Sequence, residues 1–339
     1  MVFEKKVKFF LPIICLGLVF LAACSNVTEN RLNESGDVNP KPNANSAFYF
    51  LLQDDAFIVS FQPYTKKLDT IFVGLHNVAD FAVGSGGNVL FAISTDSIFR
   101  KDLLQLGLNK RWALTYKFHD RLVCGNAGPF CAYETVVNGI QRIALFNEAT
   151  GQNVLIEEDN PGALTAPLLS TWEKWLAFSA KDGLYLKSLS SNTVARLSDS
   201  SLKAQDFSPA ESYLSADGRI FDLITLKKEP VERSGLIKFI DEFTIIWVPW
   251  NSALVKKANL SGTEEVILFE TKSPVLDFAI SPERRFVVAV NAEAQSLVFT
   301  VFDFLDMELE STLTLSQAGH KRLIKLTWPE KPGDLTHYD

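Results

Sequence analysis

Histidine and cysteine are the residue types in this chain best suited to site chemistry, and the chain has only four of each. Three histidines, His76, His119 and His320, each lie just before an apolar run that predicts a buried strand. Imidazoles at equivalent places could bind a ligand or a metal ion. Neighbouring sheets pack on the order of 10 Å apart, however, whereas a zinc–nitrogen bond is about 2 Å long. The residues favour histidines that hydrogen-bond within their own loops; the alternative that we keep is a candidate ligand face made by the three imidazoles, without a metal ion.

Tryptophan occurs in two closely spaced pairs, Trp172 with Trp175 and Trp247 with Trp250. Trp250 precedes Asn251 in a predicted turn after a strand. An exposed indole there could stack on a sugar or anchor a protein partner. We therefore add Trp250 to the candidate ligand face. The alternative is that these rings pack between structural repeats.

No sequence motif identifies a catalytic centre. The chain has no nucleophile elbow, metalloprotease helix, phosphate loop or dinucleotide fingerprint. The acidic cluster at 157–160 lacks the alternating oxygen ligands of a calcium loop, and the acids within 303–310 fit a solvated sheet edge. We predict no cofactor, no metal ion and no catalytic residue. The sequence leaves enzyme activity open, because scattered catalytic groups leave no motif.

Cys124 and Cys131 bound the segment Cys-Gly-Asn-Ala-Gly-Pro-Phe-Cys. Residues 126–129 can form a four-residue turn that places the two cysteines opposite each other in a hairpin. We predict a disulfide between them, which fits an oxidising compartment. A redox or metal role is the alternative, although two thiols without partner ligands make a weak metal motif.

Short strands separated by turns fill the chain from Ala47 onward, without a stretch of helical periodicity. Residues 80–93 align without a gap with residues 277–290, and a shorter copy begins at Asp206. These copies fit steps of about 40 residues, and such a period with several strands per unit is typical of propeller blades.

The innermost strands of seven blades are predicted to start near Val78, Arg121, Ala166, Gln205, Ile237, Val275 and Arg322. Little chain follows the seventh, whereas three strands at 47–52, 55–61 and 68–73 precede the first. We predict an all-β, seven-bladed β-propeller whose N- and C-terminal strands share one blade and close the ring. Six blades is the alternative. In this ring the blades that follow the three histidines are neighbours, so their imidazoles are predicted to lie on one face.

Residues 278–288, Phe-Ala-Ile-Ser-Pro-Glu-Arg-Arg-Phe-Val-Val, resemble the repeat of TolB-like propellers, which are related to WD repeats. In that family Ser-Pro and an Asp-Gly turn precede a buried strand. Here Glu283-Arg284, Ala210-Glu211 and Gly86-Gly87 replace Asp-Gly. Gly319-His320 resembles the Gly-His pair of WD repeats, whose histidine is structural. The resemblance implies an exported binding platform and no particular ligand.

The N-terminus has the pattern of a secretory signal, with lysines, an apolar run at 9–20 and then Leu21-Ala22-Ala23-Cys24. The last four residues resemble the lipobox of bacterial lipoproteins, which implies cleavage before Cys24 and its acylation, including palmitate. An uncleaved anchor is the alternative, although a spanning helix needs about 20 apolar residues. We predict a signal peptide at 1–23, the lipidated cysteine and a disordered linker at 24–45, and a propeller domain at 46–339.

Composition limits the partners. Removal of residues 1–23 takes away three Lys and one Glu and moves the formal net charge from −7 to −9. Such acidity argues against nucleic acid as a partner and against electrostatic binding to an anionic membrane. We predict a protein lipid-anchored to the outer side of a bacterial membrane, inner or outer, that is a non-catalytic binding or scaffolding module for an envelope protein or a surface glycan. A propeller hydrolase acting on a glycan or a peptide is the alternative, and a mainly structural role in the envelope is a third.

Overall fold

The computed structural model describes residues 47–52, 57–72, 78–84, 88–103, 109–156, 162–228, 233–316 and 322–328. These residues form β-strands and no helix, so none belongs to a helix that could span a membrane. The first half of the chain contains β1 (Phe48–Leu52), β2 (Phe57–Gln62), β3 (Lys67–Phe72), β4 (Asp80–Gly84), β5 (Val89–Ile93), β6 (Ser97–Asp102), β7 (Asn109–Ala113), β8 (Phe118–Cys124), β9 (Phe130–Val137), β10 (Ile140–Asn147), β11 (Gln152–Leu155), β12 (Leu164–Leu169), β13 (Trp175–Ala180), β14 (Gly183–Ser188) and β15 (Val194–Ser198). The second half contains β16 (Ala204–Phe207), β17 (Tyr213–Ala216), β18 (Arg219–Asp222), β19 (Lys227–Lys228), β20 (Gly235–Phe239), β21 (Thr244–Pro249), β22 (Leu254–Asn259), β23 (Val266–Glu270), β24 (Val275–Ile280), β25 (Phe286–Glu293), β26 (Ser296–Asp303), β27 (Glu308–Leu315) and β28 (Leu323–Thr327).

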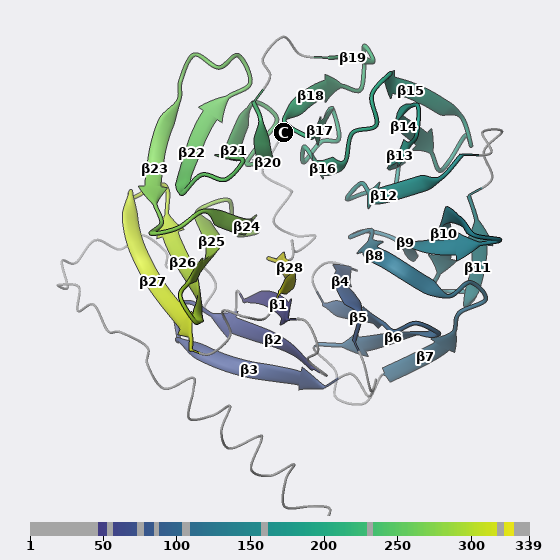
Figure 1. The fold of residues 1–339 in the computed structure, drawn as a ribbon, viewed down its shortest axis with the longest axis horizontal. Coiled ribbons are helices and arrows are strands. Elements are labelled where there is room, and N and C mark those ends of the chain that lie inside the picture. The colour runs from purple at the N-terminus through teal and green to yellow at the C-terminus, as the bar shows by residue number, and fades with distance from the viewer. Residues whose placement is uncertain are drawn as a thin grey trace, which may run out of the picture.

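The strands form seven antiparallel sheets of four, and each sheet is one blade of a ring (Figure 1). The innermost strands are, in circular order, β28, β4, β8, β12, β16, β20 and β24, and each contacts the next around the ring. The predicted seven-bladed propeller is confirmed, and the six-bladed alternative is wrong. The observed inner strands begin within a few residues of the predicted starts.

One blade is built from both ends of the described chain, as predicted. β28 is its inner strand and pairs with β1, so that Tyr49 lies opposite Thr327 and Phe50 opposite Leu326. β2 and β3 complete the same sheet. The ring is therefore closed by hydrogen bonds between segments that lie at opposite ends of the sequence.

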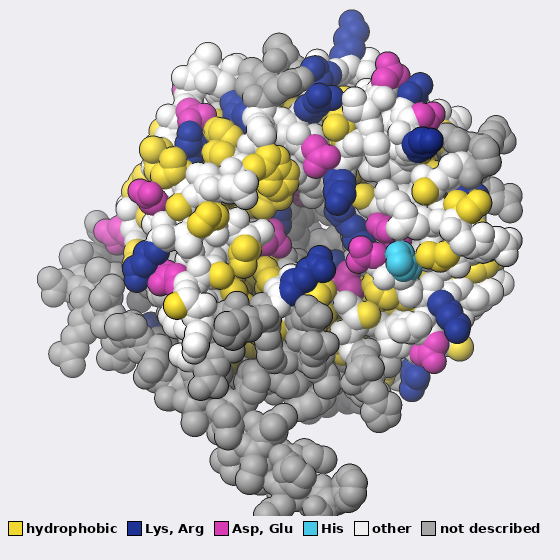
Figure 2. Space-filling view, viewed as in Figure 1, with side chains coloured by type: hydrophobic (Ala, Val, Ile, Leu, Met, Phe, Trp, Pro, Cys, Tyr) yellow, Lys and Arg dark blue, Asp and Glu magenta, His cyan; other side chains and the backbone are white. Residues whose placement is uncertain are grey.

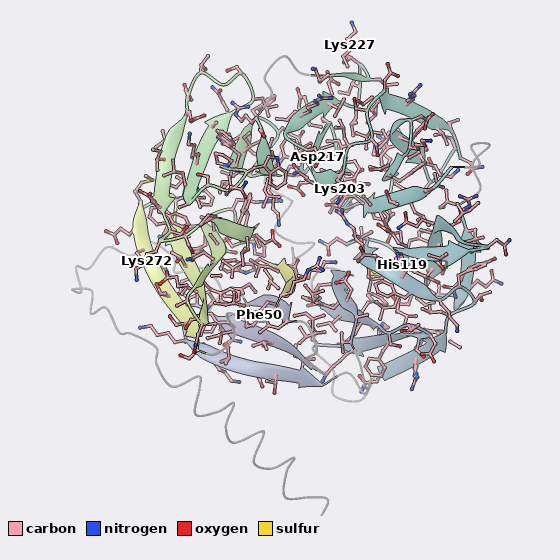
Figure 3. All side chains as sticks on the ribbon, viewed as in Figure 1. Phe50, His119, Lys203, Asp217, Lys227 and Lys272 are labelled. Atoms are coloured by element: carbon pink, nitrogen blue, oxygen red, sulfur yellow. A yellow bond between two sulfur atoms is a disulfide. The ribbon has the colours of Figure 1, made fainter. Side chains whose placement is uncertain are left out.

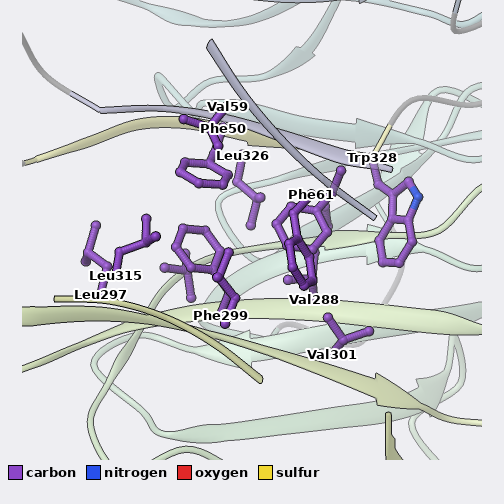
Figure 4. Packing of buried hydrophobic residues seen from close by; sticks show 14 of the residues in the cluster. Phe50, Val59, Phe61, Val288, Leu297, Phe299, Val301, Leu315, Leu326 and Trp328 are labelled. Atoms are coloured by element: carbon purple, nitrogen blue, oxygen red, sulfur yellow. The ribbon is translucent and has the colours of Figure 1, made fainter. Parts of the chain in front are cut away.

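The apolar core lies between the blades. The buried apolar residues form seven clusters, and each cluster joins one pair of adjacent blades. At the closing interface, the ring of Phe299 lies 5.8 Å from that of Phe48 and 4.5 Å from that of Phe50 (Figure 4). The continuous apolar run at 286–290 is fully buried in β25, because neighbouring blades cover both faces of the sheet.

The ring has two faces, which the strand directions define. All inner strands start on one face, here called the front face, which carries His119, Lys203 and Asp217 and is turned toward the viewer in Figure 3. They end on the opposite face, called the back face. The turns after the inner strands and the turns between the third and fourth strands of each blade lie on the back face. β1 is the second strand of its blade, so the chain enters the ring at Phe48 on the back face.

Candidate binding site in the central channel and on the ring faces

The inner strands enclose a central cavity of about 220 Å³. Residues of all seven blades line it: Val83, Cys124, Asn126, Leu169, Thr171, Asp206, Lys238, Ala279, Ile280, Arg284, Thr327 and Trp328. On the front face, acidic and basic side chains both surround the opening of the channel (Figure 2). The channel is therefore polar and carries both charge signs.

A buried ion pair joins three blades in the channel. Asp80 Oδ1 accepts a hydrogen bond from Phe81 N at 2.7 Å, and Oδ2 accepts one from Leu122 N of the next blade at 2.6 Å. Lys325 Nζ lies 3.6 Å from Oδ2 and donates to the carbonyl oxygen of Leu122. Burial raises the pKa of Asp80 and lowers that of Lys325, and each charge opposes the shift of the other. The pair holds the closing blade, the β4 blade and the β8 blade together.

Two further charged residues make similar bonds across the ring. Glu134 Oε1 accepts a hydrogen bond from Ala166 N of the next blade at 2.7 Å, and burial raises the pKa of this glutamate. Arg121 Nη2 donates to the carbonyl oxygen of Ala204, two blades away, at 3.0 Å. Burial lowers the pKa of this arginine, while nearby acids led by Glu134 oppose the shift.

The Asp-Phe pairs of the sequence repeat belong to this set of bonds. Asp206 Oδ2 accepts from Phe239 N of the next blade at 2.8 Å, as Asp80 does with its own neighbour. Asp277 Oδ1 accepts from Phe278 N at 2.8 Å, and Lys238 Nζ lies 4.0 Å away. The repeat was visible in the sequence. Its carboxylates were not recognised as links between blades, because the partners are backbone N–H groups that no side-chain pattern reveals.

A second set of inter-blade bonds lies on the back face, in the turns after the inner strands. Glutamates in these turns reach back to the preceding blade. The donors and acceptors are Phe130 N to Glu173 Oε1 (2.9 Å), Trp172 N to Glu211 Oε1 (2.6 Å) and Ser208 Oγ to Glu242 Oε2 (2.8 Å). Arg284 instead donates from Nη1 to the carbonyl oxygen of Phe239 at 2.9 Å. Glu211 and Arg284 stand where the resemblance expects Asp-Gly, so the departure from that pattern supplies a link between blades.

The segment between Cys124 and Cys131 is held by the same kind of contact. The two cysteines lie opposite each other in the register of β8 and β9, with their sulfur atoms 2.04 Å apart. The carboxylate of Glu173 fills the space where a Cβ of Gly125 or Gly128 would lie. Burial raises the pKa of Glu173 to about 7, although hydrogen bonds from Phe130 N and Gly128 N oppose the shift. The hairpin is therefore clamped both by its own sulfurs and by the next blade.

The candidate ligand face is described only in part. His119 is exposed at the start of β8 on the front face (Figure 3), whereas His76 and His320 lie outside the described residues. Trp250 is exposed in the turn after β21, also on the front face. The two described members therefore share a face but belong to different blades. Cys24, the predicted lipidation site, lies outside the described residues.

The remaining tryptophans of the two pairs differ in their surroundings. Trp172 is exposed in a turn on the back face, opposite the face that carries Trp250. Trp175 and Trp247 are partly buried, and each lies against a lysine ammonium, Lys174 at 5.1 Å and Lys256 at 4.9 Å. Each pair thus has one exposed and one packed ring.

The acids predicted to form a solvated edge differ from that prediction. Asp303 is buried, and Arg285 pairs with both Asp303 and Asp306. This arginine follows the inner strand of the same blade, which explains why spacing alone did not suggest the pair. The cluster at 157–160 lies outside the described residues. In the described parts of the chain, no group of three or more His, Cys, Asp or Glu side chains could hold a metal ion.

The chemistry available in the channel follows from these bonds. A general acid or base must reach a substrate proton with a free carboxyl or imidazole. The carboxylates of Asp80, Glu134 and Asp206 accept backbone N–H groups of the neighbouring blade. They are thus held by the scaffold that they stabilise.

Comparisons with known proteins agree on the fold. No protein-family model and no curated protein matches the chain. Among solved structures, TolB from Acinetobacter baumannii matches with a TM-score of 0.54 and 14% identity, over 85% of this chain and 67% of that one. Dihydro-heme d1 dehydrogenase NirN, in complex with DHE, matches with a TM-score of 0.56 and 11% identity, over 85% of this chain and 76% of that one. At these identities the likeness shows the fold alone: the chain is a seven-bladed β-propeller similar in architecture to TolB.

Proposed function

We propose that this protein is an exported, lipid-anchored propeller that serves as a non-catalytic binding or scaffolding module. Its partner would be another envelope protein or a surface glycan, bound across the front face. One observation carries the proposal: the charged groups of the channel bond to the backbone of neighbouring blades. They make the ring a rigid platform, and a preorganised surface loses less entropy on binding.

The front face supports a polar partner. Acidic and basic side chains surround the channel opening there (Figure 2), and Trp250 adds one exposed indole. Charges of both signs on a rigid rim favour specificity through complementary charge, and an exposed tryptophan is a frequent interface anchor. His119, exposed at the same rim, is a candidate contact in this proposal.

The proposed location rests on the sequence. The segment that ends at Cys24 resembles a lipobox, and the disulfide proposed between Cys124 and Cys131 suits an oxidising compartment. Membrane attachment through the N-terminal lipid follows from these features, and the resident membrane, inner or outer, is left open.

The test is crosslinking in intact cells, followed by mass spectrometry of the captured material. The full chain is compared with a Cys24→Ser variant, which lacks the proposed lipid site. The proposal predicts an envelope protein captured reproducibly by the anchored chain and lost or reduced in the variant. Capture of nothing above the variant would argue against a stable protein partner, and binding to purified surface glycans would then be measured.

A propeller hydrolase acting on a glycan or a peptide is the second candidate. The observation that favours it is Glu134, whose pKa burial raises and whose nearest titratable neighbours include Asp120 and His119. A carboxyl group with a raised pKa beside other titratable groups is a candidate catalytic acid. Glu134→Gln should then abolish hydrolysis of glycan or peptide substrates while leaving the protein folded. A loss of stability without any activity to lose would favour the binding module.

A further inference from the structure

Six large apolar side chains project from turns on the back face. They lie on four consecutive blades, those that begin with β12, β16, β20 and β24. They are Trp172, Ile224, Leu226, Phe243, Leu305 and Met307. The most exposed are Ile224 at 81%, Phe243 at 67% and Leu305 at 61%. Exposed apolar side chains grouped on one face of a folded protein mark a surface that contacts a protein or a membrane. We call these six residues the back-face apolar set.

Two of the turns show that these apolar residues are not needed for the fold. Five of the seven blades have a four-residue turn between the third and fourth strands, and the last residue of this turn is in the left-handed region. In three blades that residue is Lys66, Gly151 or Asn192, and the second turn residue is Tyr64, Ala149 or Ser190. In the other two blades the same positions hold Ile224 with Leu226 and Leu305 with Met307.

The left-handed conformation makes this choice costly. Leu226 has a φ of 56° and Met307 a φ of 58°. Bulky side chains are uncommon there, whereas Gly and Asn adopt it readily. Placing an exposed leucine and an exposed methionine at such positions serves neither the turn nor the core. A contact outside the ring explains their presence.

The position of the chain entry favours a membrane as that contact. β1 starts at Phe48 on the back face, so the segment that follows Cys24 joins the ring on the same face as the apolar set. The 23 residues between Cys24 and Phe48 reach at most about 80 Å when extended. A lipid on Cys24 therefore holds the ring near the bilayer, and the back face can meet it without the tether passing around the rim.

The surrounding charges favour apolar insertion over attraction to anionic lipid. Exposed Lys227 and Lys228 follow Leu226, whereas exposed Glu308 follows Met307, and Asp306 pairs with Arg285. The turns thus carry both signs, and the chain without residues 1–23 has a formal net charge of −9. Tryptophan and aliphatic side chains at loop tips partition into the interface of a neutral bilayer through buried apolar area.

We infer that the back face rests on the phospholipid surface, with the back-face apolar set in the interfacial region. The inference rests on the lipid anchor of the proposed function, and it adds an orientation to it. The front face, with Trp250, His119 and the charged channel opening, then points away from the membrane toward the partner.

The first test uses the mature chain carrying Cys24→Ser, so that no lipid contributes, and vesicles of phosphatidylcholine. The test variant replaces Ile224→Ser, Leu226→Asn, Leu305→Ser and Met307→Asn, which copies the turn of Ser190 and Asn192. We expect its partition into vesicles to fall at least tenfold. An unchanged thermal transition shows that the ring remains folded.

Two tryptophans provide a matched pair for the same experiment. Trp172 on the back face is 50% exposed and Trp250 on the front face is 48% exposed. Trp172→Ser should weaken vesicle binding several-fold, and Trp250→Ser should leave it unchanged. Equal effects of the two substitutions, or no effect of either, would contradict a back-face contact.

The second test uses the lipidated protein in vesicles that contain spin-labelled phosphatidylcholine. A fluorophore placed at position 224 should be quenched by the labelled lipid, and the same fluorophore at position 250 should not. If the protein is anchored but neither position is quenched, the membrane contact is refuted while the lipid anchor stands. If the full chain made in cells is not recovered with their membranes, the proposed lipid anchor is refuted. The membrane contact of the back face is then decided by the vesicle binding of the unlipidated chain in the first test.

Discussion

The buried pair of Asp80 and Lys325 provides the strongest quantitative prediction. In Asp80→Asn, the side-chain amide keeps one oxygen, which can accept from only one of the N–H groups of Phe81 and Leu122. Its NH₂ group then faces the other donor, and Lys325 loses the carboxylate that lies 3.6 Å from its ammonium. The substitution therefore leaves one buried N–H donor without an acceptor and one partly buried ammonium without its counterion, although Lys325 keeps its hydrogen bond to the carbonyl oxygen of Leu122.

The expected cost follows from these losses. An unsatisfied buried donor costs about 1–3 kcal/mol, and removal of one partner of a buried ion pair costs about 3–5 kcal/mol. Because the side chain of Lys325 is 23% exposed, water compensates part of the second loss. We expect Asp80→Asn to lower the free energy of unfolding by about 3–4 kcal/mol. Lys325→Met combined with it should cost less than the sum of the two single substitutions, by at least about 1 kcal/mol.

Urea unfolding followed by tryptophan fluorescence measures these changes. Asp120→Asn is the matched control. Asp120 is an exposed aspartate in the inner strand β8, and its carboxylate accepts a hydrogen bond from Arg121 N, its neighbour in the chain, and not from a described residue of another blade. We expect a change within about 0.5 kcal/mol for this control. A wild-type unfolding free energy for Asp80→Asn, or full additivity with Lys325→Met, would refute the view that the channel charges hold the blades together.

Three more predictions concern stability. Burial raises the pKa of Glu173 from 4.5 to about 7, so between these pH values the folded protein keeps a proton that the unfolded chain has released. The free energy of unfolding should therefore fall by roughly 1–3 kcal/mol as the pH rises through this window. Urea unfolding from pH 4 to 8 measures this change, and Glu173→Gln should make the free energy of unfolding nearly independent of pH there. Replacing Cys124 and Cys131 by serine should lower the free energy of unfolding by about 2.5 kcal/mol, because the crosslink that closes an eight-residue loop is lost. Adding a reductant to the wild-type protein should lower the free energy of unfolding by the same amount. Phe299→Ala should cost about 3–5 kcal/mol in calorimetry, because its ring is fully buried at the closing interface; a cost below 1 kcal/mol would show that this interface does not hold the ring shut.

Much of the architecture could be predicted from the sequence, because blade repeats leave a periodic record. The alignment of residues 80–93 with 277–290 and the apolar run at 286–290 predicted strands buried on both sides. The short C-terminal remainder predicted the shared blade. These inferences need only the spacing of the sequence repeats and the positions of the apolar residues, and a single sequence contains both.

The links between blades could not be predicted in the same way. Asp80, Glu134 and Glu173 bond to backbone N–H groups of other blades, and a backbone donor has no signature in the sequence. The pair of Arg285 with Asp303 was missed because the two residues meet only after the sheet forms. The back-face apolar set was missed for a related reason. Exposure is set by which turn tips project from the ring, and hydrophobicity alone does not distinguish Leu226 from a buried leucine.

The candidate ligand face is the predicted feature that the structure describes least completely. The sequence placed three histidines on neighbouring blades, and only His119 lies within the described residues. Trp250 shares its face but belongs to another blade. A front-face site therefore stays a proposal that rests on the charged rim and Trp250, and a cluster of imidazoles stays a prediction.

The most direct test of the account is site-specific photo-crosslinking in living cells, with the same photoreactive residue placed at position 250 or at position 172. The two positions carry the same residue type at nearly equal exposure on opposite faces. The account predicts capture of an envelope protein or a surface glycan from position 250 and of lipid from position 172. Capture of the same protein from both positions, or of a protein only from position 172, would contradict a propeller that sits on the membrane and binds its partner through the front face.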